Sequence, residues 1–114
     1  MVNTKNRGIL ENIQNHCKRI ETIKSGLKKE EYDKNENFKE LFCFHILQIG
    51  ELVKHFDDEF VKSYSKVPWG DIAGMRDIVA HGYGTIKTEE VWKVVNNDIP
   101  ELVQYCNQIL DENK

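Results

Sequence analysis

Three side chains that can act on a phosphodiester lie close together in the sequence: Arg76, His81 and Tyr83. A histidine titrates near neutral pH, so it can take a proton from a ribose 2′-hydroxyl or give one to a leaving oxygen. An arginine presents a planar fork that matches phosphate and can stabilise the charge that develops on it. Together these residue types predict cleavage of RNA without a metal ion, with Tyr83 on the rim of the same cleft.

The spacing of these residues is a weak signal by itself, because an Arg and a His near a helix end also form ion-paired caps that have no chemistry. Five residues along a helix correspond to about 140° of rotation, so Arg76 and His81 do not share a helix face. We expect a helix break at residues 80–82, where Gly82 and Gly84 would let the imidazole swing back beside the guanidinium. One histidine cannot easily serve as acid and base at once, which favours a site shared by two copies.

The elements that position these residues are predicted to be helices, because apolar residues recur at spacings of three and four and strand signals are almost absent. We expect long helices at residues 5–25, 36–56, 68–80 and from 88 onward, and a short helix at 58–64. The charged segment at residues 28–37 should begin as a loop or exposed turn. Gly26 should end the first helix, and Pro100 should kink or restart the last one, with Asp98 and Glu101 as a capping box. The sum is an all-α, up-and-down bundle of four long helices and one short helix, in one domain that spans residues 1–114.

The helix at residues 68–80 is expected to place Arg76 on an apolar face with Trp69, Ile72 and Val79. A guanidinium is costly to bury unpaired, so Arg76 should meet an acidic partner or an anion in a cleft. Glu51 is a candidate partner of Arg76 across helices, and the alternative is that Glu51 forms a surface or interface salt bridge. Asp77 can orient Arg76 or His81, or it can be a solvated carboxylate. Gly70 and Gly74 should permit close approach of another backbone.

The helix at residues 36–56 contains a stretch, residues 41–47, with one polar residue in seven. A helix that is apolar nearly all round must be covered on more than one side. We expect one face in the core and the other against a second copy of the chain. His45 should be a core or interface histidine, whereas His16 and His55 should be exposed.

Composition narrows the class of protein. The net charge is −3, and residues 1–57 carry ten basic against nine acidic side chains, so there is no basic coat for nucleic acid and an RNA ligand would need a local positive site. The sequence has three cysteines, Cys17, Cys43 and Cys106. Their odd number and wide spacing argue against a set of disulfides and favour buried thiols in a reducing cytoplasm. We expect no signal peptide, no membrane span, no metal site and no cofactor.

The string from Trp69 to Tyr83 closely resembles the HepT-like branch of the HEPN superfamily. That branch is marked by Arg–x4–His–x–Tyr, here Arg76, His81 and Tyr83, after a Trp–x2–Ile–x2–Met segment. The segment Gln48 to Glu51 resembles its Ile-Gly-Glu signature, and Trp92 with residues 98–102 resembles its last helix. The resemblance covers nearly the whole chain.

The resemblance implies a HEPN-like homodimer that acts as a metal-independent endoribonuclease, with Arg76 and His81 of both copies at one site. It implies the toxin of a type VII toxin–antitoxin system. The implied partner is a minimal nucleotidyltransferase (MntA-like) antitoxin that adds AMP to Tyr83. AMP would bring bulk and negative charge to a cleft meant for RNA phosphate, so it should block entry.

The sequence leaves one alternative open. The acidic net charge and the apolar helix at residues 36–56 also suit a helical module without catalytic activity. Such a module would bind a nucleotidyltransferase, or present a nucleotide or another substrate to it.

Overall fold

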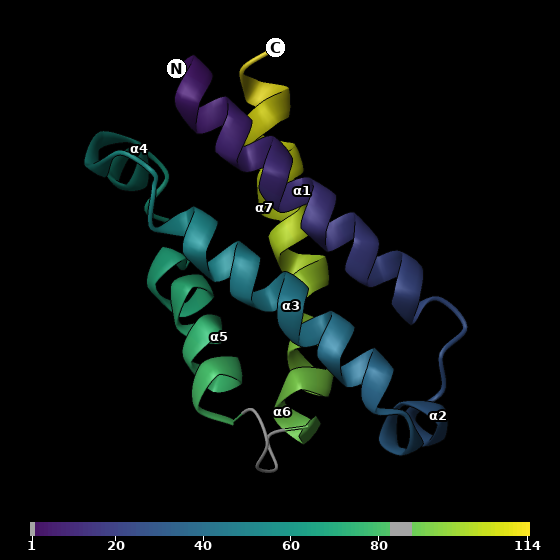
Figure 1. The fold of residues 1–114 in the computed structure, drawn as a ribbon. Helices are drawn as coiled ribbons and strands as arrows, with labels where there is room; N and C mark the ends of the chain where they lie inside the picture. Colours follow the sequence, from purple (N-terminus) through teal and green to yellow (C-terminus); the bar gives the residue numbers. More distant parts are fainter. Residues whose placement is uncertain (1, 83–87) are drawn as a thin grey trace.

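The computed structural model describes residues 2–82 and 88–114 of the chain, without the side chains of residues 80–82, and their regular structure is all helical. The long helices are α1 (Thr4–Lys24), α3 (Glu36–Val53), α5 (Trp69–Gly82) and α7 (Ile99–Glu112). In Figure 1, α3 crosses the front of the bundle between α1 and α5, and α7 runs behind it. The predicted all-α bundle with four long helical stretches is confirmed.

Local signals explain the ends of α1. The Asn3 side chain accepts a hydrogen bond from the Asn6 backbone N–H at the start of this helix, as expected of an N-cap residue. At its end Gly26 has a φ of +77°, a left-handed conformation that glycine adopts without strain. Gly26 therefore ends the first helix as the sequence predicts.

The charged segment at residues 28–37 begins with a single non-helical residue, Lys28, so the loop or exposed turn expected at its beginning is shorter than predicted. It forms the short helix α2 (Lys29–Lys34), followed directly by α3. The Glu31 side chain accepts from the Lys28 backbone N–H, and Lys29 pairs with Asp33 one turn on. The decisive residue is Tyr32, which is fully buried, lies 4.6 Å from Trp92 between ring centroids, and donates to the Thr88 carbonyl. One buried aromatic ring thus holds a helix whose remaining residues are mostly charged.

The α5 helix is longer than predicted. After the short α4 (Asp58–Ser63), α5 begins at Trp69 and its backbone stays helical through Gly82. The expected break at residues 80–82 is therefore wrong, because the backbone is helical at all three residues. Arg76 and His81 lie on one continuous helix, with their backbone positions about 140° apart.

The last part of the chain bends without a new cap. It consists of α6 (Thr88–Lys93), a π-helical turn η1 (Val94–Asp98) and α7, and Asp98 makes no side-chain cap. The predicted capping box is therefore wrong. The Ile99 N–H reaches back to the Val94 carbonyl, five residues earlier. This wider turn accommodates Pro100, which has no N–H to donate and would crowd a regular helix.

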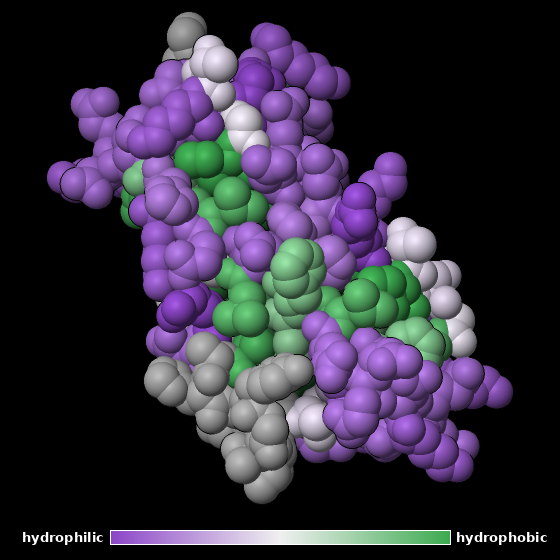
Figure 2. All heavy atoms as spheres, in the orientation of Figure 1, coloured by the Kyte–Doolittle hydropathy of each residue, from purple (hydrophilic) through white to green (hydrophobic). Residues whose placement is uncertain are grey.

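The core joins all the long helices and includes the three cysteines, which are free and buried as expected. His45 is also buried, with 5% of its surface exposed. Two large apolar side chains of α3 stay exposed, Leu41 at 45% and Phe44 at 51%. Figure 2 shows hydrophobic side chains gathered over α3 and toward the end of α1, bordered by hydrophilic ones. Among the described helices, none is long and apolar enough to cross a membrane.

Candidate active site

The helices α3 and α5 approach each other closely at Gly50, and the absence of a side chain there makes this approach possible. A Cβ built on Gly50 would lie 2.7 Å from the Arg76 Cβ and 3.3 Å from the Ala73 carbonyl oxygen. The glycines expected to serve this purpose, Gly70 and Gly74, have nothing within 4 Å of such an atom. The close approach thus depends on the Ile-Gly-Glu segment of α3 rather than on the glycines of α5.

Arg76 is paired with Glu51 across this contact. The Arg76 Nε lies 2.5 Å from a Glu51 carboxylate oxygen, and the two side chains are 37% and 48% exposed. Ile72 and Val79, on the same face of α5, are buried. The structure therefore anchors the base of the guanidinium at the helix contact while more than a third of the side chain remains open to solvent.

The carboxylate of Asp77 lies farther from the guanidinium. Its oxygen is 3.7 Å from Arg76 Nη1, and its side chain is 66% exposed. Glu51 also lies 3.5 Å from the Lys54 ammonium. Exposed ion pairs of this kind contribute about 0–1 kcal/mol to stability, so their role is to orient side chains rather than to hold the fold. The ion pair through Nε leaves the Nη2 amino group without a protein partner among the described residues.

The other two predicted site residues are only partly within the described structure. His81 belongs to the last turn of α5 by its backbone, but its side chain lies outside the described residues. Tyr83 lies outside them altogether. The structure thus joins Arg76, Glu51 and Asp77, and it places the backbone of His81 farther along the same helix.

Sequence reasoning missed a pair of histidines on the opposite side of α3. His16 is half-buried rather than exposed, because its Nδ1 lies 3.0 Å from the Nδ1 of His45. Burial lowers the pKa of both imidazoles, Arg19 lowers it further for each, and His16 also lowers that of His45. One of the two Nδ1 atoms must carry the hydrogen that the other accepts, and the lowered pKa values favour the neutral form of both rings near pH 7. The available signal was that His16 lies three residues after Ile13, at the edge of an apolar stripe.

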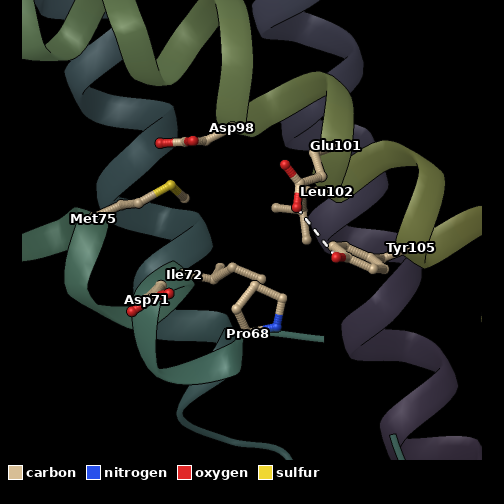
Figure 3. Close-up of a pocket in the computed structure, with 8 residues that line it drawn as sticks. All are labelled: Pro68, Asp71, Ile72, Met75, Asp98, Glu101, Leu102 and Tyr105. Carbon is tan, nitrogen blue, oxygen red and sulfur yellow. Dashed lines mark hydrogen bonds between the residues drawn. The ribbon is translucent and has the colours of Figure 1, made fainter. Parts of the chain in front are cut away.

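A pocket between α5 and α7 has the wrong charge for RNA. It has a volume of about 250 Å³, and three carboxylates, Asp71, Asp98 and Glu101, stand around its apolar wall (Figure 3). Burial raises the pKa of Asp98, and Glu101 and Asp71 raise it further. Tyr105 donates a hydrogen bond to Glu101 at 3.1 Å. A phosphate would meet like charge here, so this pocket is not part of a nucleic-acid site.

The described helices form an all-α bundle that is compatible with a protein of the HEPN type. The family model described as "Ribonuclease HepT-like" matches residues 13–109, and the chain belongs to this family.

Named relatives agree with that assignment. The chain is 37% identical to "Putative RNase TTE0752" of Caldanaerobacter subterraneus subsp. tengcongensis, over 95% of this chain and 96% of the relative. It is 32% identical to "Probable ribonuclease HepT" of Thermococcus cleftensis, over 82% of this chain and 84% of the relative. No solved structure gave a significant match.

Proposed function

We propose that this protein is an endoribonuclease that cleaves RNA without a metal ion, using Arg76 and His81. The observation that carries the proposal is Arg76, a half-exposed guanidinium on an otherwise buried helix face, anchored through Nε by Glu51. Its Nη2 amino group has no protein partner among the described residues, and its Nη1 group has only the long contact to Asp77, so the outer edge of the guanidinium can bind phosphate. Membership of the ribonuclease HepT-like family supports the same reaction.

In the proposed reaction the 2′-hydroxyl attacks the adjacent phosphorus, the bond from phosphorus to the 5′-oxygen breaks, and a cyclic phosphate forms. Arg76 stabilises the charge that develops on the phosphate oxygens. One His81 takes the proton of the 2′-hydroxyl and the His81 of a second copy gives a proton to the leaving 5′-oxygen. Glu51 holds the guanidinium in place, and Asp77 biases its orientation.

A homodimer is part of this proposal because two histidines are needed. The exposed Phe44 lies on α3 at helical spacing from Gln48 and Glu51, so one stripe leads from an apolar patch to the Arg76 ion pair. Large exposed apolar side chains beside polar ones are typical of interaction surfaces. A second copy that packs on Phe44 would bring the two Arg76 sites toward each other.

The cleavage test uses purified protein, RNA and EDTA. Wild type should cleave, and His81→Ala and Arg76→Ala should each lose at least about 100-fold in rate. His55→Ala, which removes an exposed histidine of another region, is the matched control and should cleave normally. Equal cleavage by wild type and both site variants would refute the assignment.

We further propose that the protein is the toxin of a type VII toxin–antitoxin system, controlled by AMP on Tyr83. A minimal nucleotidyltransferase would be the antitoxin, and the added phosphate would exclude RNA from the Arg76 cleft by charge and bulk. After co-expression with such an enzyme, intact mass should rise by whole AMP units, and Tyr83→Phe should remove the increase. An unchanged mass of the wild type would count against Tyr83 as the control point.

A second candidate function is a binding module without catalysis, and the exposed Leu41 and Phe44 favour it. Both functions are compatible with a nucleotidyltransferase partner, so binding to it does not separate them. Growth arrest on expression without the partner does. Arrest that disappears in His81→Ala supports the nuclease, whereas absence of arrest with wild type supports the binding module.

A further inference from the structure

A groove between α1 and α3 lies on the other side of α3 from Arg76. It has a volume of about 370 Å³, and its lining includes Lys18, Arg19 and Ile23 of α1 with Leu41 and His45 of α3. Nothing in the proposed reaction uses these residues. In Figure 2, hydrophobic side chains over α3 meet hydrophilic ones toward α1.

The rim of this groove is positively charged. Lys18 and Arg19 are both exposed, and no carboxylate in residues 2–82 and 88–114 lies within ion-pairing distance of either. The amide of Asn15 adds a hydrogen-bonding group to the same rim, whereas the Thr22 hydroxyl already donates to the Lys18 carbonyl. In a chain of net charge −3 this is a local positive site, and it contrasts with the carboxylates of the pocket in Figure 3. Phosphate is the complementary ligand.

The floor of the groove is apolar. Ile23 is half-buried and Leu41 is 45% exposed, so both can cover the flat face of a nucleobase. Proteins that hold single-stranded nucleic acid without reading its sequence combine a positive groove with side chains that cover the faces of the bases, most often aromatic ones. In this groove the aliphatic side chains of Ile23 and Leu41 would take that place. An acidic peptide would use the rim but would leave the floor uncovered.

The groove and the Arg76 ion pair share α3. Leu41, in the groove, lies ten residues before Glu51, the partner of Arg76, on this helix. Ten residues of helix span about 15 Å, which a few nucleotides of extended strand can bridge. We propose that this groove binds the RNA substrate a few nucleotides from the bond that is cut, with phosphate on Lys18 and Arg19 and a base on Ile23 and Leu41. The inference rests on the proposed ribonuclease function.

Binding can be measured apart from cleavage in the full-length His81→Ala protein. Fluorescence anisotropy would compare RNA of about 4 nucleotides with RNA of about 12. The double variant Lys18→Gln/Arg19→Gln should weaken binding of the longer strand about tenfold or more, because two charge-assisted contacts are lost. The slope of log affinity against log salt should fall by about 1.4. The shorter strand should lose less, so that the preference for length shrinks.

The matched control is Lys62→Gln/Lys66→Gln, which removes the same charge from exposed positions away from the groove. It should keep both the affinity and the preference for length. A second readout is the NMR titration of His45, which lines the groove and whose pKa is lowered by burial, His16 and Arg19. A phosphate at Arg19 offsets part of that effect, so RNA should raise the pKa of His45.

The outcomes separate this inference from the proposed function. If wild type cleaves RNA and the groove variant binds it as tightly as the control, the groove is not a substrate site. A groove variant that changes only the oligomeric state would show a protein contact and would also overturn the inference. If wild type fails to cleave but the groove variant still loses RNA binding, the ribonuclease proposal fails and the groove site stands.

Discussion

The polar pairs on the two sides of α3 differ in charge and in exposure to solvent. Toward α5, a glycine brings the backbones together and a charged pair, Arg76 with Glu51, remains more than one-third exposed. Toward α1, the polar pair is His16 with His45, which is neutral and of which His45 is buried. Burying a charge is costly, whereas a neutral hydrogen-bonded pair costs little. The charged guanidinium of Arg76 therefore remains accessible to a ligand. The pair of His16 and His45 instead connects α1 and α3.

The largest expected effect on cleavage comes from replacing Arg76 by another positively charged residue. Arg76→Lys keeps the positive charge but loses the fork that matches phosphate. Cleavage should fall about 100-fold or more, a loss of about 3 kcal/mol in transition-state stabilisation. Steady-state rates on RNA would measure it, with thermal unfolding as the check that the fold is intact. Activity within a few-fold of wild type would mean that Arg76 acts as a simple point charge.

The next effect concerns the backbone contact that carries the charged pair. Gly50→Ala puts a methyl group 2.7 Å from the Arg76 Cβ, so the helices must move apart. We expect a loss of about 1–3 kcal/mol in the free energy of unfolding and a matching loss of cleavage. Gly74→Ala is the control, since nothing lies within 4 Å of its added atom, and it should stabilise α5 by about 0.5–1 kcal/mol. Denaturant titrations of both variants give the comparison, and equal stability would contradict the close contact.

The pair of His16 and His45 should make the free energy of unfolding depend on pH. Because the pKa of His16 and of His45 is lowered in the folded protein, the unfolded chain binds more protons below its own histidine pKa of 6.5. The pair's contribution to stability is therefore complete above pH 6.5 and is lost as pH falls through the lowered values. His16→Gln should flatten the dependence of unfolding free energy on pH between 7.5 and 5, and cost about 1 kcal/mol at pH 7.5 from the lost hydrogen bond.

The exposed His55, on the segment after α3, provides the control for this pH effect. His55→Gln should leave the dependence of stability on pH as steep as in wild type, since His55 is exposed. A variant His16→Gln whose stability still falls as steeply as that of wild type would show that the imidazole pair is not the source.

The smallest effect is expected at Asp77. Its carboxylate is 66% exposed and 3.7 Å from Arg76 Nη1, so Asp77→Asn should change stability by no more than about 0.5 kcal/mol. The rate of RNA cleavage should change only a few-fold. A loss as large as that of Arg76→Lys would place Asp77 in direct contact with the reacting groups and would change the proposed division of roles.

The sequence predicted the fold well because the apolar periodicity of the long helices is strong. It also predicted Glu51 as a candidate partner of Arg76. It failed where tertiary contacts override local pattern: one buried Tyr32 turns a charged segment into α2, and a π turn replaces the expected cap before Pro100. The pairing of His16 with His45 needs the crossing of α1 and α3, which periodicity alone does not give.

Gly50 has a consequence for how this protein can vary. Every residue that a single nucleotide change can introduce at a glycine codon carries a Cβ, and the space beside Gly50 is already filled by Arg76 and Ala73. Any single substitution of Gly50 therefore disturbs the contact between the helices, although glycine itself has no side chain that could take part in a reaction. Surveys of natural variants should find glycine there even in copies of the protein that have lost Arg76 through drift, provided the crossing of α3 and α5 persists.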